Sequence, residues 1–115
     1  MKVFIIHSLG LSKLALQYTK ELENVGNEVY IPCRDTNQKS TESGILQSNF
    51  NGAKWCDEAH VIWDGISLGS IFDMGTIYAL NKPLKIIKVI PPKQKVSYVM
   101  HWAKYAMENE GKYLW

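Results

Sequence analysis

Short apolar runs alternate with longer amphipathic segments along most of this chain. The runs are rich in β-branched residues and end at glycine, proline or polar residues, a pattern typical of buried strands. The predicted strands are 3–6, 28–31, 60–63 and 84–90. Between them, apolar positions recur at the spacing of an α-helix. The predicted helices are 12–25, 43–58, 71–80 and 97–108. Ser12 is the expected N-cap of the first helix, Gly26 follows its end, and the polar stretch 33–42 is expected to be a loop.

Strands that alternate with helices favour a parallel sheet, because right-handed crossovers place the helices on both of its faces. We therefore predict a single α/β domain over residues 1–115, a flavodoxin-like, doubly wound three-layer sandwich. The expected strand order is 2-1-3-4, with residues 113–115 as a candidate fifth strand. In this order the chain reverses direction between strands 1 and 3. The loops 7–11 and 64–70 should then lie side by side over a ligand-binding crevice.

The composition and charge of the chain limit the classes of partner that this domain could bind. The chain has 115 residues, 46% hydrophobic and 21% charged, which is ordinary for one globular core. Its formal net charge of +2, with mostly scattered lysines, argues against nucleic acid as a partner. No apolar run approaches the roughly 20 residues of a membrane span. Because the N-terminal apolar run is also too short for a signal peptide, we expect a cytoplasmic protein with no membrane contact.

The cysteines and aromatic residues carry weaker signals. In the cytoplasm, Cys33 and Cys56 are expected to be reduced thiols. Cys33, Cys56 and His60 could suggest zinc, but no second close pair of ligands exists, so free thiols and a surface histidine are favoured. We predict no metal and no other cofactor. The four tryptophans and six tyrosines could stack on a ligand or fill a subunit interface.

The two crevice loops contain residue types that suit a hydroxyl or phosphate ligand. Glycines allow close backbone approach, and the helix that follows each loop would point amide groups into the crevice. Neither loop contains Lys or Arg, so a phosphate would rest on amides and serine hydroxyls. Glycine and serine are also common in ordinary loops, and a histidine at a strand end often only anchors its loop. The candidate substrate-binding residues are His7, Ser8, Leu9, Gly10, Gly65, Ser67, Gly69 and Ser70.

Two carboxylates are the candidate catalytic residues. Asp73 falls early in the third predicted crossover helix, between Phe72 and Met74, and should face the crevice. A carboxylate in a partly apolar crevice can attack an anomeric carbon or stabilise an oxocarbenium-like centre. Asp64 ends the third predicted strand, where it could hold a sugar hydroxyl or act as an acid or base. An aspartate at that position could equally be an Asx-turn residue, and an early helical aspartate could simply complement the helix dipole.

The motif around these carboxylates resembles a known superfamily. Ser67-Leu68-Gly69-Ser70-Ile71-Phe72-Asp73-Met74-Gly75 follows an apolar run and leads to Asn81-Lys82-Pro83. This pattern resembles the nucleoside 2-deoxyribosyltransferase superfamily, whose signature is Gly-x-x-aromatic-Glu-aliphatic-Gly and then Gly-Lys-Pro. The Ser-Leu-Gly opening is similar to the 2′-deoxynucleoside 5′-phosphate N-hydrolase branch, whose serine contacts the 5′-phosphate. Trp63-Asp64-Gly65 looks more like the transferase branch, whose aspartate lies near the sugar and base.

The resemblance implies a substrate and a reaction. The ligand would be a nucleoside or a nucleoside 5′-monophosphate, and the reaction would be cleavage or transfer at its N-glycosidic bond. Asp73 would be the nucleophile, at the position of the family's glutamate. The resemblance also implies a homodimer or a higher homo-oligomer, in which a neighbouring subunit completes each site.

Three departures from the family pattern bear on catalysis. Aspartate is one methylene shorter than glutamate, so the carboxylate of Asp73 would retreat by about 1 Å, a shift that can reduce rates by orders of magnitude. The aspartate that the family often carries in the preceding helix falls near Asn51 or Gly52. The chain is also short for the family. A catalytically weak nucleotide-binding or sequestering protein on the same fold is therefore the alternative function.

Other readings of the sequence stay open. Gly65-Ile66-Ser67-Leu68-Gly69 fits the G-x-S-x-G nucleophile elbow with His101 downstream, but the chain is short for an α/β-hydrolase. The first apolar run resembles that of TIR-type domains, some of which cleave NAD, so a TIR-like NAD glycohydrolase is a minor alternative. A third alternative is an assembly module whose crevice binds no ligand.

Overall fold

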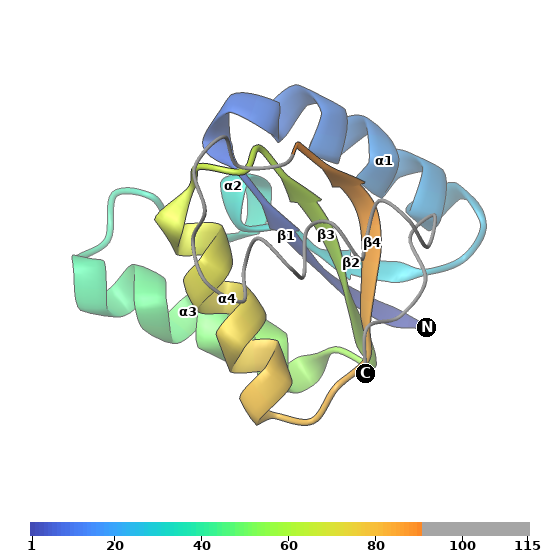
Figure 1. The fold of residues 1–115 in the computed structure, drawn as a ribbon. Coiled ribbons are helices and arrows are strands. Elements are labelled where there is room, and N and C mark those ends of the chain that lie inside the picture. The colour runs from blue at the N-terminus through green and yellow to red at the C-terminus, as the bar shows by residue number, and fades with distance from the viewer. Residues whose placement is uncertain (91–115) are drawn as a thin grey trace.

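A computed structural model describes residues 1–90 of the chain. Its elements follow the predicted alternation of strands and helices (Figure 1). In chain order they are β1 (Lys2–His7), the 3-10 turn η1 (Leu9–Leu11), α1 (Ser12–Asn24), β2 (Glu28–Tyr30), α2 (Pro32–Asp35), α3 (Glu42–Trp55), β3 (Glu58–Trp63), α4 (Leu68–Ala79) and β4 (Leu84–Val89). The predicted helix 97–108 and the candidate fifth strand 113–115 lie outside the described residues.

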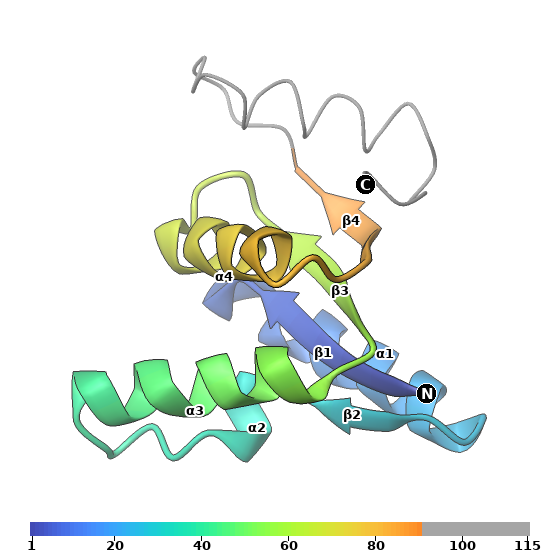
Figure 2. The ribbon, with the colours of Figure 1, turned by 90° about the horizontal axis from the view of Figure 1, so that it is seen from below.

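The sheet has the predicted strand order. It runs β2-β1-β3-β4, and each pair of neighbouring strands is parallel. Helix α1 lies over one face, whereas α3 and α4 lie side by side over the other, as Figures 1 and 2 both show. This arrangement confirms the three-layer, flavodoxin-like α/β fold and places the strand reversal between β1 and β3.

Alternating side chains of the central strands supply two cores. Val3 and Ile5 of β1 point toward α1, whereas Phe4 and Ile6 point toward α3 and α4. All four side chains are buried, because each face of a parallel sheet is covered by helices. The side of α3 and α4 also holds Trp63, the largest fully buried side chain in the described part of the chain.

Several predicted boundaries shift in the structure. Ser12 is the first residue of α1 rather than its N-cap, and its hydroxyl donates to the Leu9 carbonyl in the preceding 3-10 turn (2.7 Å). Helix α3 ends at Trp55 rather than near residue 58, because Glu58 already pairs with β1 as the first residue of β3. Helix α4 starts at Leu68, three residues earlier than predicted, so the last three residues assigned to the crevice loop are helical.

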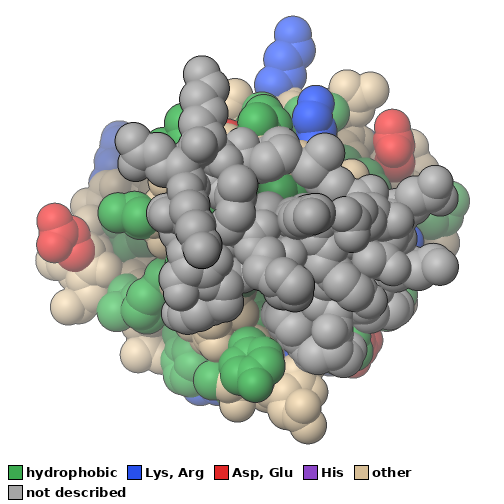
Figure 3. Space-filling view, in the orientation of Figure 1, with side chains coloured by type: hydrophobic (Ala, Val, Ile, Leu, Met, Phe, Trp, Pro, Cys, Tyr) green, Lys and Arg blue, Asp and Glu red, His purple; other side chains and the backbone are tan. Residues whose placement is uncertain are grey.

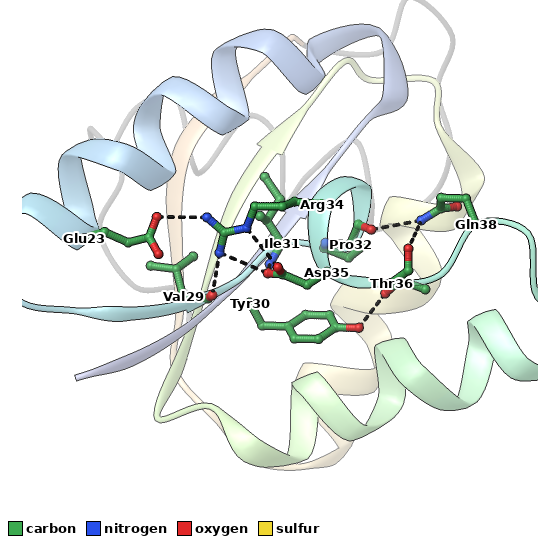
Figure 4. Close-up of polar contacts among 9 residues, drawn as sticks. All are labelled: Glu23, Val29, Tyr30, Ile31, Pro32, Arg34, Asp35, Thr36 and Gln38. Carbon is green, nitrogen blue, oxygen red and sulfur yellow. Dashed lines mark hydrogen bonds and ion pairs between the residues drawn. The ribbon is translucent and has the colours of Figure 1, made fainter.

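The segment 33–42, predicted to be a loop, begins within the short helix α2. Arg34 holds this helix in place through three partners drawn in Figure 4. It donates to Glu23 of α1 (2.9 Å), to the neighbouring Asp35 (2.8 Å) and to the Val29 carbonyl of β2 (3.0 Å). The connection that leaves the carboxyl end of β2 is therefore fixed to both neighbouring elements.

Tyr30 links the end of β2 to α3. Its hydroxyl lies 2.5 Å from the Thr36 hydroxyl, which in turn donates to the side chain of Asn49 (2.8 Å). The Tyr30 ring also packs on Gly52, where an added Cβ would lie 2.8 Å from a ring carbon. Glycine at position 52 thus lets α3 approach the sheet closely, and an acidic side chain at that position would not fit.

Candidate functional site

The loops after β1 and β3 are joined directly at the carboxyl end of the sheet. The Ser8 amide donates to the Ile62 carbonyl (3.1 Å), and the Asp64 amide donates to the Ser8 hydroxyl (2.9 Å). The structure therefore confirms that these loops lie side by side at the strand reversal. Ser8 is only 1% exposed, so its hydroxyl serves this loop-to-loop contact.

Asp64 organises the turn that leads into α4. One of its carboxylate oxygens accepts from the amides of Ile66 and Ser67, each at 2.8 Å, while Gly65 supplies the positive φ of 80° that the turn requires. Partial burial raises the pKa of Asp64, but the hydrogen bonds from Ser67, Ile66 and Ser8 outweigh it and hold the pKa below its ordinary value. Asp64 is therefore an ionised Asx-turn residue, the structural role that the sequence left open.

The start of α4 offers backbone amides rather than charged side chains. Ser67 is its N-cap residue but makes no capping bond with its side chain, so the first amides of the helix lack a side-chain cap. The buried Ser70 hydroxyl lies 3.4 Å from the Ser67 hydroxyl, and the Ser67 carbonyl accepts from the Trp63 indole (3.0 Å). An added Cβ at Gly69 would meet no atom of residues 1–90 within 4 Å, so this part of the chain leaves open space beside the first turn.

Asp73 is the sixth residue of α4, and its environment differs sharply from that of Asp64. Its side chain is partly buried, and burial raises its pKa from the ordinary value of 3.8 to about 6. No hydrogen bond or ion pair to another residue in 1–90 offsets that burial. A carboxylate that is neither bonded nor fully solvated is suited to react with a ligand or to receive a proton from one.

The loop after β1 is partly buried at His7 and exposed at Leu9. His7, at the end of β1, is partly buried, and its Nδ1 lies 3.1 Å from the Ser8 carbonyl. Burial lowers the pKa of His7 despite that bond, so the ring is neutral near pH 7. Beyond it, Leu9 is 80% exposed, and an added Cβ at Gly10 would meet no described residue within 4 Å. These residues leave room for a ligand beside the β3–α4 turn.

A cavity that the sequence did not predict opens between α3 and α4. Its volume is about 360 Å³, and its lining residues are Ser43, Leu46, Gln47, Phe50, Phe72 and Thr76. The three apolar side chains among them are all partly exposed to solvent. The sequence signal for such a cavity is an apolar stripe on the outer face of each helix. Recognising it requires knowledge of how the two helices pack against each other. Of this lining, the sequence singled out only Phe72, as a neighbour of Asp73.

The second acidic position of the resembled family has no acidic counterpart at Asn51 or Gly52. Gly52 lies under the Tyr30 ring, and Asn51 is exposed on α3, where its side-chain oxygen accepts from Gln47 (3.0 Å). In the structure, it is Asn49 of α3 that is held by the loop after β2, through Thr36.

The zinc alternative finds no support in the geometry of its residues. The predicted surface position of His60 is wrong, since it is 2% exposed and its ring nitrogens lie 2.7 Å from Tyr18 and from Glu58. Burial lowers the pKa of His60. Cys33 and Cys56 pack against cores on opposite faces of the sheet, and both are free thiols. Within residues 1–90, no group of three His, Cys, Asp or Glu side chains could hold a metal ion.

Two further observations concern the remaining alternatives. His101, the possible base of a Ser67 nucleophile, lies outside the described residues. Among the helices in residues 1–90, none combines the length and the apolar character that crossing a lipid bilayer requires.

Comparison with known proteins supports the fold, although the sequence comparisons found no match. No protein-family model and no curated protein sequence matches the chain. Among solved structures, the chain is similar to a 2-deoxyribosyltransferase from the psychrotolerant bacterium Bacillus psychrosaccharolyticus, with a TM-score of 0.68 and 15% identity. The match covers 90% of this chain and 82% of that one. The chain therefore has a nucleoside 2-deoxyribosyltransferase-like fold, in agreement with the resemblance of its motif.

Proposed function

We propose that this protein binds a nucleoside or a nucleoside 5′-monophosphate and cleaves or transfers at its N-glycosidic bond. The observation that carries the proposal is the partly buried Asp73, whose pKa is raised to about 6 on the helix that begins beside the joined loops of the strand reversal. The similarity of the fold to a 2-deoxyribosyltransferase supports it. At pH 7 most of the Asp73 carboxylate is ionised, and it is poised to attack or stabilise an anomeric carbon.

The neighbouring residues have distinct proposed roles. The amides at the start of α4 and the Ser67 hydroxyl hold the 5′-phosphate or 5′-hydroxyl, at the positive end of the helix dipole. Gly10 and Gly69 leave space for the sugar, since a Cβ at either position would meet nothing within 4 Å in the described part of the chain. Asp64 keeps the turn in shape and presents its second carboxylate oxygen to a sugar hydroxyl or a transferred proton.

A binding protein without efficient turnover is the second candidate. The observation that favours it is the shorter side chain of Asp73, which stands where the resembled family has glutamate. No acidic side chain at position 52 could assist it, because Gly52 is packed under Tyr30. Such a protein would hold the same ligands in the same crevice without breaking the bond.

Chromatography of reaction mixtures tests the proposal. The purified protein is incubated with each of the four deoxynucleosides and their 5′-monophosphates, with and without a second free base, and with NAD in a parallel mixture. Release of a free base establishes hydrolysis, and a new nucleoside that forms only with the second base establishes transfer. A thermal shift with one ligand and no product in any mixture would favour the binding protein. Nicotinamide release alone would favour the TIR-like alternative.

We also propose that the active form is a cytoplasmic homodimer. Three aliphatic residues of the crevice loops and the start of α4 are each about 80% exposed: Leu9, Ile66 and Leu68. Such exposed apolar side chains would be covered in a subunit interface. Sedimentation equilibrium across a range of concentrations checks the oligomeric state. A monomer that retains full activity at the lowest concentration would contradict this proposal.

A further inference from the structure

Trp63 joins the core to the turn that leads into α4. Its side chain is fully buried in the core on the side of α3 and α4, which also contains Met74 and Ile77 of α4. A buried indole N–H requires an acceptor, and the Trp63 Nε1 donates to the Ser67 carbonyl (3.0 Å). Ser67 is the N-cap residue of α4. The start of this helix is therefore tied to a side chain that close packing holds in place.

The backbone of Ser67 is held from two directions. Its amide donates to the Asp64 carboxylate (2.8 Å), and its carbonyl accepts from Trp63. Its hydroxyl, in contrast, caps no amide of the helix, and the Ser70 hydroxyl lies 3.4 Å from it, at the long limit of a hydrogen bond. The structure thus fixes the Ser67 backbone and leaves its hydroxyl out of the cap.

Precise orientation matters at this place because the neighbouring donors are uncharged. Neither crevice loop contains Lys or Arg, and α4 contains none over Leu68–Ala79. Hydrophobic side chains gather beside α3 and α4 at the lower left of Figure 3. A lysine ammonium on its flexible stem can follow a displaced phosphate, whereas a backbone amide cannot. Amides bind an anion well only if the protein holds them in the binding orientation beforehand.

We infer that Trp63 is a positioning residue, which holds the start of α4 in the orientation that binds a 5′-phosphate and thereby favours a nucleoside 5′-monophosphate over the free nucleoside. This inference rests on the proposed function and deepens it, since that function leaves the two substrates open. Trp63 acts through the Ser67 carbonyl rather than by contact with the ligand, because its side chain is fully buried. The Asp64 carboxylate holds the amide of the same residue from within the turn.

Replacing the indole N–H with a sulfur atom tests the inference at nearly constant shape. In Trp63→β-(3-benzothienyl)alanine, the side chain keeps its fused rings and loses only its donor. Calorimetry of the full-length protein with each deoxynucleoside 5′-monophosphate and each matching deoxynucleoside gives the affinities. We expect the variant to bind the preferred monophosphate about tenfold more weakly, on the scale of one well-made hydrogen bond. Its affinity for the matching deoxynucleoside should stay unchanged.

The matched control is the same replacement at Trp55, the last residue of α3, where the ring centroid lies 5.7 Å from the Lys2 ammonium. It should leave both affinities unchanged. Trp63→Phe also lacks the donor, so it should lose the same preference for the monophosphate, although its smaller ring should lower the stability as well. In the unaltered protein, the backbone amide resonances of Leu68 and Gly69 should shift more with the monophosphate than with the nucleoside.

Three results would overturn the inference. The first is an equal weakening of both ligands in the Trp63 variant, which would make this side chain a core residue and nothing more. The second is an unchanged preference for the monophosphate despite the loss of the donor. The third is the absence of any preference for the monophosphate in the unaltered protein.

Turnover separates this inference from the proposed function. In an active enzyme, the KM for the monophosphate should rise about tenfold in the Trp63 variant with kcat unchanged, since the donor holds the start of α4 and not Asp73. Base release with the same ratio of KM values for monophosphate and nucleoside in both proteins would leave the proposed function standing and refute the role of Trp63. A preference for the monophosphate that depends on the donor, in a protein that releases and transfers no base, would support that role and refute the enzymatic function.

Discussion

Asp64 and Asp73 belong to one turn-helix unit, yet their carboxylates experience opposite environments. Asp64 accepts hydrogen bonds from two amides at 2.8 Å, and its pKa lies below the ordinary value. Asp73 is partly buried without a partner in the described structure, and its pKa is raised to about 6. Two carboxylates with pKa values pushed apart in this way commonly divide the work of a site. In the proposed function, Asp64 maintains the turn and assists with a sugar hydroxyl or a proton, whereas Asp73 acts at the anomeric carbon.

The largest effect is expected from changing the reactive member of this pair. Asp73→Asn keeps the size of the side chain but removes the nucleophile, so it should reduce turnover by at least about 10³-fold while ligand binding persists. Asp73→Glu restores the reach of the family's side chain and should raise turnover above that of the unaltered protein. Base release, quantified by chromatography, measures both.

The complementary control is Asp64→Asn, whose amide oxygen can still accept both bonds of the turn. If Asp64→Asn reduces turnover as strongly as Asp73→Asn in a folded protein, the division of roles is wrong and both carboxylates act in the chemistry. Turnover that is unaffected by Asp73→Asn would remove Asp73 from the reaction altogether.

The next largest effect is expected from removing the carboxylate of Asp64, which organises the turn. Asp64→Ala leaves the amides of Ile66 and Ser67 without their acceptor, which should reduce the free energy of unfolding by about 2 kcal/mol. Asp64→Asn should lose less, because it preserves both bonds without the charge. Urea denaturation at pH 7 measures the two variants. Equal stability of Asp64→Ala and the unaltered protein would show that the turn does not depend on this carboxylate.

The two carboxylates should also give opposite dependences of stability on pH. The native pKa of Asp73 is raised, so its contribution is complete below about pH 4 and is lost as the pH rises through about 6. Asp73→Asn should therefore be more stable than the unaltered protein by about 3 kcal/mol at pH 8, and equally stable near pH 3.5. The native pKa of Asp64 is lowered, so its contribution is present above its ordinary pKa and disappears as the pH falls below it.

Thermal unfolding of both variants between pH 3.5 and pH 8 measures these profiles. A stability difference for Asp73→Asn that does not grow with pH would mean that the carboxylate is solvated or paired in solution. The rise in its pKa, and with it the contrast to Asp64, would then be wrong.

The sequence predicted the parts of this contrast that depend on local pattern. The strand order and the contact between the loops follow from the alternation of apolar runs and helices, and the Asp-Gly dipeptide already indicated a turn at Asp64. The partial burial of Asp73 was expected only in outline. Its pKa depends on how α4 packs against the sheet and against α3, which no local pattern specifies.

Tertiary packing also explains what the sequence missed. His60 was expected at the surface, but Tyr18 from α1 and Glu58 from the same strand lie against its two ring nitrogens inside the fold. The cavity between α3 and α4 depends on two helices that meet only in the folded chain. Ser8 was a candidate ligand donor, yet pairing with the Asp64 amide buries its hydroxyl.

The smallest expected effect therefore tests the link between the two loops. Ser8→Ala removes the acceptor of the Asp64 amide (2.9 Å) and should reduce the free energy of unfolding by about 1 kcal/mol. Since the Ser8 hydroxyl also helps to lower the pKa of Asp64, that pKa should rise toward its ordinary value, as carboxyl ¹³C NMR can measure. The pKa of Asp73 should stay near 6, because burial alone raises it. If both pKa values move together, the two carboxylates are coupled, and the contrast between an anchoring and a reactive aspartate would have to be replaced by a single titrating unit.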